Sequence, residues 1–239
     1  MLSPLAIDDV TPRCLHTAGL LPDAPSTQDL RHAEALVHER RRVEKGEALY
    51  RTGDVTNEVY VVRIGTFKTH VASADGHAQV MGFHLPGELL GLDGLADLHH
   101  TAHATALEDS EVCVIRLADL QTVAADMPAL PLRFLRALGK ELTQDQTMMV
   151  RLGSMRAQER LAAFLIDLSQ RMEARGYSAS EFNMRMTRED IGSYLGLTLE
   201  TVSRLFSRLA DAGLLAIRQR HVKLLDLAAM RRLYRADCH

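Results

Sequence analysis

The chain has 239 residues, of which 46% are hydrophobic and 25% are charged, and its formal net charge is −3. This composition excludes a disordered or fibrous protein, and the length is sufficient for two domains with separate cores. The slight negative charge argues against a protein that coats nucleic acid through bulk electrostatics, but it allows a local basic surface.

The sequence predicts no contact with a membrane. No apolar run approaches the roughly twenty residues that span a bilayer, and the N-terminal MLSPLAIDDV has acidic residues where a signal peptide has basic ones. We therefore expect a cytoplasmic protein. Cys14, Cys113 and Cys238 are too few and too scattered to form a disulfide framework.

The N-terminal region shows little periodicity. Residues 1–28 include four prolines, which predicts an irregular arm that contains Cys14. Residues 30–42 have a helical pattern with many charges, and we interpret their basic side chains as a solvated helix face.

From residue 43 the pattern changes to short strand-like runs broken by glycine turns, among them VYVVRIGTFKTHV, AQVMGFHLPGE and SEVCVIRL. Asp75-Gly76 suits a type I′ hairpin turn, because such a turn requires positive φ at both central residues. Turns at regular spacing predict an antiparallel barrel or roll rather than a βαβ sheet.

After Asp126-Met127-Pro128 the pattern becomes helical, with seam residues spaced alternately by three and four. This spacing is typical of a coiled coil. Since no second long heptad pattern occurs, the simplest partner is the same helix in a second subunit. The expected dimerisation seam consists of Leu135, Leu138, Leu142, Asp145, Met149 and Leu152.

Asp145 is the exception in this seam. In a homodimer the carboxylate faces its own copy, so repulsion and desolvation weaken the dimer unless Asp145 is protonated, splayed or paired. The alternative is that Asp145 lies at the edge of the seam in solvent. The sequence does not separate these two interpretations.

Residues 187–209, TREDIGSYLGLTLETVSRLFSRL, predict two short helices joined by a glycine turn. Thr187 and Thr198 are expected N-caps, and Gly196 lies between the helices. An amphipathic helix that ends near Arg175-Gly176 precedes them, and GLLAIRQRHVKLLDL predicts two short strands that form a basic wing. Between residues 185 and 223 there are seven basic and four acidic residues, so the basic surface lies in this region.

These motifs, together with RLAAFLIDLSQR, VYVVRIGTFKTH and GFHLPGELLG, closely resemble the cyclic-AMP receptor/FNR (CRP/FNR) family of bacterial transcription regulators, and most closely its FNR branch. The resemblance covers residues from about 30 to 230. It implies an α+β fold. The expected parts are an irregular arm (1–28), a cyclic-nucleotide-binding-like antiparallel β-roll sensor domain (29–126), a long dimerisation helix (127–155) and a C-terminal winged helix-turn-helix domain (156–239).

The resemblance also implies that the second helix of the motif reads base edges in the major groove. Arg204 would donate to guanine, Glu200 would accept from an exocyclic amine, and Ser203 would bond either way. Cyclic-AMP receptors carry an arginine where this chain has Leu199, so we expect an FNR-like inverted repeat of TTGAT rather than TGTGA. The expected contacts with double-stranded DNA are Glu200, Ser203, Arg204, Thr187, Arg188, Thr198, Thr201 and Arg208. RNA polymerase is the implied further partner of such an activator.

The implied sensor chemistry departs from both branches of the family. FNR holds a [4Fe-4S] cluster with three N-terminal cysteines and one in the roll; Cys113 fits the roll position, but only Cys14 precedes it, which argues against a complete cluster. A shared cluster, a Cys14–Cys113 disulfide or histidine ligands would be needed for redox sensing, and a structural Cys113 is the simpler interpretation.

Cyclic AMP is also disfavoured. Its family receptors hold the phosphate with an Arg-Ser or Arg-Thr pair, where this chain has His99-His100-Thr101. His99, His100 and His103 leave haem or metal as an alternative, although their spacing matches no known ligand motif and we name no metal ligand.

The sequence therefore predicts a homodimeric, non-enzymatic DNA-binding regulator under the control of an effector or a redox signal. The alternative is a small-molecule or haem/metal sensor that uses its roll to act through a protein partner.

Overall fold

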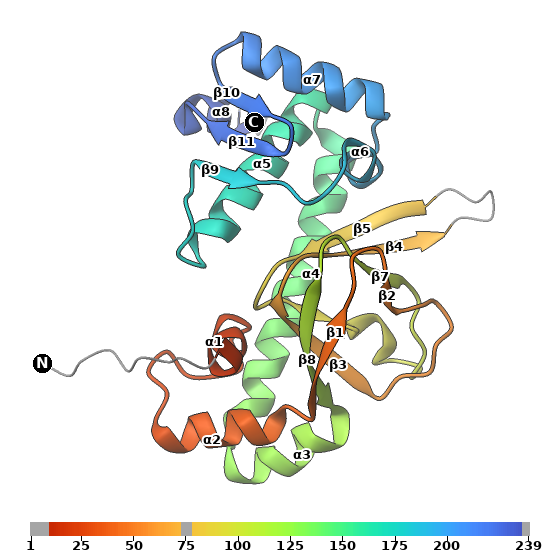
Figure 1. The fold of residues 1–239 in the computed structure, drawn as a ribbon, viewed down its shortest axis with the longest axis vertical. Coiled ribbons are helices and arrows are strands. Elements are labelled where there is room, and N and C mark those ends of the chain that lie inside the picture. Colours follow the sequence, from red (N-terminus) through yellow and green to blue (C-terminus); the bar gives the residue numbers. More distant parts are fainter. Residues whose placement is uncertain (1–9, 73–77, 236–239) are drawn as a thin grey trace, which may run out of the picture. The chain divides into compact units, whose positions relative to one another are not determined.

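The computed structural model describes residues 10–72 and 78–235 and divides into two compact units, residues 1–143 and 144–239 (Figure 1). The long helix α4 (Leu130–Ser154) begins in the first unit and ends in the second. The fold is α+β, with a cyclic-nucleotide-binding-like β domain, a long helix and a helix-turn-helix domain that carries a small sheet. Within the described ranges, every helix is too short or too polar to cross a membrane.

The first unit contains two four-stranded antiparallel sheets. One has the strand order β1-β8-β3-β6, formed by Glu39–Val43, Ser110–Arg116, Glu58–Ile64 and Leu89–Leu90. The other has the order β2-β7-β4-β5, formed by Ala48–Tyr50, His103–Ala106, Phe67–Ala72 and Ala78–His84. A short 3-10 helix, η1 (Leu92–Gly94), follows β6. The Asp75-Gly76 turn lies outside the described residues, but β4 and β5 on either side of it pair antiparallel as far as Ala72 and Ala78.

The β3/β8 sheet is buried on both faces, which explains the nearly continuous apolar runs VYVV and VCVI. Tyr60 and Val62 point into a core between the two sheets. The alternate residues Val59 and Val61, with Cys113 of β8, belong to a second core on the other face. Helices α1 (Val10–Thr17), α2 (Thr27–Leu36), α3 (Leu117–Asp126) and the first turns of α4 cover this second core.

The N-terminal arm predicted over residues 1–28 is wrong where the structure describes it. Residues 10–17 form α1, α2 begins at Thr27, and both Leu15 and Leu20 are fully buried. Pro12 lies in the first turn of α1, where a missing backbone N–H costs no helical hydrogen bond. Burial against β3 and β8, a tertiary effect, orders this segment despite its prolines.

The charged helix predicted over residues 30–42 is also corrected. Helix α2 ends at Leu36, and residues 39–43 form the strand β1, which pairs with β8 from Glu39↔Val114 to Val43↔Ser110. Pairing with a neighbouring strand overrides the local helical pattern. The arginines in this stretch are side chains of an edge strand.

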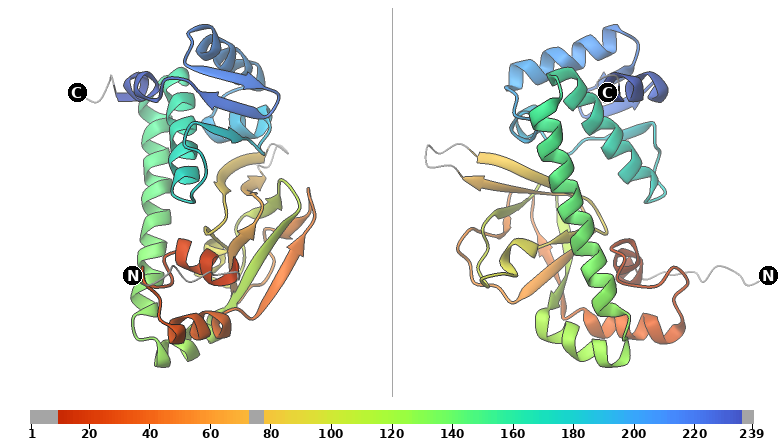
Figure 2. Two further views of the ribbon diagram at one scale, coloured as in Figure 1. Left: turned by 60° about the vertical axis from the view of Figure 1, so that its left-hand side comes forward. Right: turned by 180° about the vertical axis from the view of Figure 1, so that it is seen from behind.

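The second unit is built on α5 (Ala157–Glu173), whose apolar face is buried from Leu161 to Leu168. Around it lie α6 (Arg188–Leu195), α7 (Leu199–Asp211) and α8 (Leu227–Arg235), as two further views show (Figure 2). The two predicted wing strands are confirmed as β10 (Leu215–Arg218) and β11 (His221–Leu224). A third strand, β9 (Glu181–Asn183), completes the sheet in the order β10-β11-β9 and was missed, because three residues carry no readable period.

Candidate nucleic-acid interface and sensor site

Two capped helices, α6 and α7, form the helix-turn-helix. The Thr187 hydroxyl accepts a hydrogen bond from the Asp190 backbone N–H at 3.0 Å, and the Asp190 carboxylate accepts from the Thr187 N–H at 2.9 Å. This reciprocal capping box starts α6. The Thr198 hydroxyl accepts from the Thr201 N–H at 3.2 Å and starts α7. Both predicted N-caps are confirmed, so Thr187 and Thr198 have a structural role.

The turn between the helices depends on two glycines. Gly196 adopts a left-handed conformation with φ 63°, and the Leu197 N–H donates to the Gly192 carbonyl at 2.8 Å. A Cβ on Gly192 would lie 2.6 Å from the Leu197 carbonyl oxygen. The backbone of the turn therefore packs against Gly192 more closely than any residue with a side chain would allow. The Arg160 guanidinium of α5 also donates to the Leu195 carbonyl at 2.6 Å. These contacts fix the angle at which α7 leaves the turn.

The burial of one face of α7 leaves the expected base readers on the opposite face. Val202, Leu205 and Leu209 are buried. Glu200, Arg204 and Arg208 are exposed, whereas Ser203 and Thr201 are half-buried. Hydrogen bonds from its own backbone N–H and from the Thr198 hydroxyl hold the pKa of Glu200 below its usual range. Glu200 is therefore an ionised acceptor at neutral pH.

Arg188 differs from the other expected DNA contacts. Its guanidinium carbon lies 3.3 Å from the centroid of the Phe206 ring, and burial lowers its pKa to about 10. Its Nη1 atom is buried and has no hydrogen-bond partner among the described residues. The half-buried side chain packs α6 against α7, and the contact of Arg188 with DNA stays a prediction.

The wing presents basic side chains from the turn between β10 and β11. Arg218, Gln219 and Arg220 are exposed, and Gln219 has φ 54°. Glu181 of the missed strand β9 accepts from His221 at 2.9 Å and lies 3.8 Å from Lys223. Glu181 therefore neutralises part of the wing, and no pattern in the sequence pairs it with the wing.

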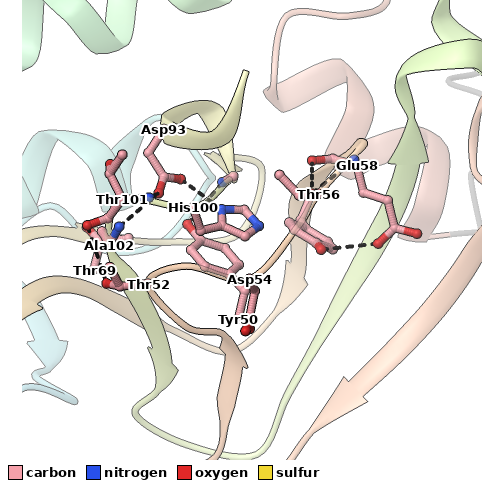
Figure 3. Close-up of polar contacts among 12 residues, drawn as sticks. Tyr50, Thr52, Asp54, Thr56, Glu58, Thr69, Asp93, His100, Thr101 and Ala102 are labelled. Carbon is pink, nitrogen blue, oxygen red and sulfur yellow. Dashed lines mark hydrogen bonds and ion pairs between the residues drawn. The ribbon is translucent and has the colours of Figure 1, made fainter. Parts of the chain in front are cut away.

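In the first unit, His100 and Thr101, which the resemblance places at the phosphate-binding pair of cyclic-AMP receptors, belong to an internal network (Figure 3). The buried His100 ring stacks on Tyr50 with 3.6 Å between centroids, and its Nδ1 lies 3.2 Å from an Asp93 oxygen. The other Asp93 oxygen accepts from the backbone N–H groups of Thr101 and Ala102 at 2.8 and 3.0 Å. The Asp93 carboxylate thus accepts from the backbone N–H groups that would otherwise be available to a bound phosphate.

Helix α1 also covers the glycine turn before β6. A Cβ on Gly87 would lie 2.3 Å from the Thr17 methyl group, and the buried Glu88 carboxylate accepts from the Leu85 N–H at 2.9 Å. Together with the Asp93 network, this arrangement does not fit a cyclic nucleotide.

The three candidate histidines do not converge on a common point. His100 contacts Asp93, the His99 Nδ1 lies 2.8 Å from the Asp97 carbonyl, and the His103 ring stacks on His70 at 5.0 Å. Across the described ranges, no group of three or more His, Cys, Asp or Glu residues has the geometry of a metal site. An iron–sulfur cluster does not fit either. It requires four thiolates, and the described residues bring together only Cys14 and Cys113, while Cys238 lies outside them.

A polar pocket of about 460 Å³ adjoins the His100 network. Arg41 lines this pocket. Its Nη2 lies 3.2 Å from a carboxylate oxygen of Glu58, and its guanidinium carbon lies 5.6 Å from the centroid of the Tyr60 ring. The full lining comprises Arg41, Leu49, Tyr50, Asp54, Val55, Thr56, Asn57, Glu58, Tyr60 and His100.

The seam side of α4 carries large apolar side chains in contact with solvent. Leu135, Leu142 and Met149 are 61%, 59% and 64% exposed, and Leu152 is 38% exposed. Leu138 is half-buried, and Asp145 is exposed in the single chain. Partial desolvation raises the pKa of Asp145 above its usual range.

This combination of an antiparallel roll, a long helix and a winged helix-turn-helix defines a class of DNA-binding transcription regulators. Residues 159–233 match the Crp-like helix-turn-helix domain, and residues 40–126 match the cyclic nucleotide-binding domain. The chain belongs to the CRP/FNR family, whose members are transcription regulators and not enzymes.

Several relatives match most of the chain. The transcriptional regulatory protein btr of Bordetella pertussis is 49% identical over 92% of this chain and 91% of its own length. The fumarate and nitrate reduction regulatory protein of Escherichia coli is 37% identical over 89% of this chain and 85% of its own. Among solved structures, FixK2 of Bradyrhizobium japonicum has a TM-score of 0.75 and 31% identity, and the match covers 82% of this chain and 96% of FixK2.

Proposed function

We propose that this regulator acts as a homodimer that binds an inverted repeat of TTGAT half-sites. The observation that carries the proposal is the outward face of α7, where Glu200 and Arg204 are exposed one helical turn apart and Ser203 lies beside them. Arginine pairs bidentately with guanine, and a carboxylate accepts from the amine of cytosine or adenine. Leu199 is also exposed and brings an apolar group where cyclic-AMP receptors have an arginine donor.

The exposed stripe on α4 supports the dimer. An apolar seam in solvent is unfavourable for an isolated subunit, and burial against a second copy of the same helix removes it from water. A two-fold axis would then present two α7 helices to successive major grooves, about 34 Å apart. We propose that an effector or redox signal shifts the populations of dimer arrangements that do or do not meet this spacing.

Transcription activation through RNA polymerase is part of the same proposal. Its support is the similarity to the transcriptional activator protein Anr of Pseudomonas protegens, which is 42% identical over 86% of this chain and 84% of its own length.

The test is fluorescence anisotropy with a labelled TTGAT palindrome, a palindrome with the guanine replaced, and a scrambled duplex. Arg204→Ala should weaken binding to the intact palindrome by about 1–3 kcal/mol per half-site and should remove most of the discrimination at the guanine. Arg42→Ala replaces an exposed arginine of the first unit and should leave affinity unchanged. Equal affinity of Arg204→Ala and the parent for all three duplexes would contradict base reading and favour a regulator that acts through a protein partner.

A further inference from the structure

The two thiols that are far apart in the sequence meet in the second core of the first unit. Cys14 comes from α1 and Cys113 from β8, and their sulfur atoms lie 3.6 Å apart across a sequence separation of 99 residues. Both residues are reduced, Cys113 is fully buried, and Cys14 is 4% exposed. A disulfide requires about 2.05 Å between the sulfur atoms, so the two sulfur atoms must approach each other further before they can be joined.

We propose that Cys14 and Cys113 form a redox modification site, at which a peroxide such as hydrogen peroxide oxidises the dithiol to an intramolecular disulfide that alters DNA binding. The regulatory part of this proposal rests on the proposed DNA-binding function, whereas the thiol chemistry is independent of it.

The reaction balances with one peroxide for each pair of thiols. One sulfur, as thiolate, attacks a peroxide oxygen; the O–O bond breaks, hydroxide leaves and takes up a proton, and the sulfur becomes a sulfenic acid. The second sulfur then attacks this sulfenic sulfur, the S–O bond breaks, and a second water leaves. Two electrons pass from the sulfurs to the peroxide oxygens, and both thiol protons end in water.

The surroundings favour the thiolate at Cys113, whereas the hydrogen bond to Cys113 and burial raise the pKa of Cys14. The contact between the two thiols lowers the pKa of Cys113, and the nearby guanidinium groups of Arg63 and Arg40 act in the same direction. Thiolate is the reactive form of cysteine. The peroxide would approach from the side of Cys14, because Cys14 is the more exposed of the two and local opening of the short helix α1 would uncover the pair.

The pair is coupled to α4 through the core that it shares. Leu130 is buried in the same cluster as both cysteines, and Phe134 and Ala137 of α4 pack against it. The Arg133 guanidinium also donates to the Leu21 carbonyl at 2.9 Å, in the segment between α1 and α2. A disulfide would fix α1 to β8 beneath the first turns of the helix that bears the proposed dimer seam.

The test uses the full chain, reduced and then treated anaerobically with hydrogen peroxide. The intact protein should lose two hydrogen atoms in mass, and peptide mapping should join the peptides of Cys14 and Cys113. Cys238→Ser should react like the parent, whereas Cys14→Ser and Cys113→Ser should not form this crosslink. The mapping of the parent decides the question even if a serine in the buried strand prevents folding. A crosslink to Cys238, or overoxidation without the Cys14–Cys113 bond, would overturn the site.

DNA affinity is then measured for the reduced and oxidised parent and for Cys14→Ser under both treatments. We expect a change of at least about tenfold, equivalent to 1.4 kcal/mol, in the parent and none in the variant. Disulfide formation with unchanged affinity would overturn the regulatory role. Failure of both redox forms to prefer the palindrome would instead contradict the proposed function and leave the thiol chemistry intact.

Discussion

At the scale of single residues, the helix-turn-helix depends on side chains that contact other residues of the same motif. The Asp190 carboxylate accepts from both the backbone N–H and the hydroxyl of Thr187, and Arg188 stacks on Phe206. These residues hold α6 against α7 and leave Glu200 and Arg204 for a ligand. The two arginines therefore differ in their surroundings: the Arg188 guanidinium lies on the Phe206 ring, whereas Arg204 is exposed to solvent.

Two helical glycines, Gly192 and Gly139, allow a crowded position and an open one to be compared by the same substitution. Gly192→Ala places a methyl group 2.6 Å from the Leu197 carbonyl, and we expect a loss of about 1–3 kcal/mol in the free energy of unfolding of the second unit. Gly139→Ala adds a methyl group with no atom within 4 Å and should stabilise α4 by about 0.5–1 kcal/mol. Urea unfolding followed by circular dichroism measures both changes, and equal stability of the two variants would contradict the close turn.

At the scale of elements, α4 differs from the other long helix, α5. The apolar side chains of α5 are buried within the second unit, whereas those along the seam of α4 are exposed in the single chain. Asp145 interrupts this stripe, and its raised pKa shows that its ionised form is disfavoured even before a partner helix approaches.

The dimer should respond to pH through Asp145. Because the pKa is raised, the neutral carboxyl is favoured; the repulsion between two copies is relieved as pH falls through this pKa and returns as pH rises through it. Sedimentation velocity at decreasing pH from 7.5 should show dimers of the parent that tighten as Asp145 takes up its proton. Asp145→Asn keeps the side-chain size without the charge, and it should dimerise more tightly at pH 7.5 with a weaker pH dependence. An identical pH profile for both proteins would place Asp145 outside the seam.

At the scale of the whole molecule, charge is unevenly distributed. The net charge is −3, yet residues 185–223 include seven basic and four acidic residues. Glu181 further reduces the positive charge of the wing, because it pairs with His221 and Lys223. Nonspecific attraction to DNA should therefore be weak, and specific binding should depend on a few placed cations.

Salt dependence tests this distribution. The logarithm of the association constant should fall linearly with the logarithm of salt concentration, by about 0.9 for each phosphate contact. Arg220→Ala, at the exposed tip of the wing, should reduce this slope by about one per subunit without changing base preference. Arg42→Ala should leave the slope unchanged, and an unchanged slope for Arg220→Ala would mean that the wing does not contact the backbone.

The sequence alone determined the elements whose local signals agree with their packing. The caps Thr187 and Thr198, the glycine turn at Gly196 and the two wing strands all form as predicted. In these segments the periodicity and the capping chemistry act within a few residues, so neighbouring positions carry the information.

Only the tertiary structure decided the N-terminal region and the contact between Cys14 and Cys113. Residues 10–17 lack a clear period, yet they form a helix because Leu15 is buried in a core built by distant strands. Residues 39–43 have a helical composition, yet they pair with β8. The approach of Cys14 to Cys113 spans 99 residues, and no local pattern encodes it. Contacts of this kind depend on how a whole core closes, which is a property of many residues together and of no single stretch.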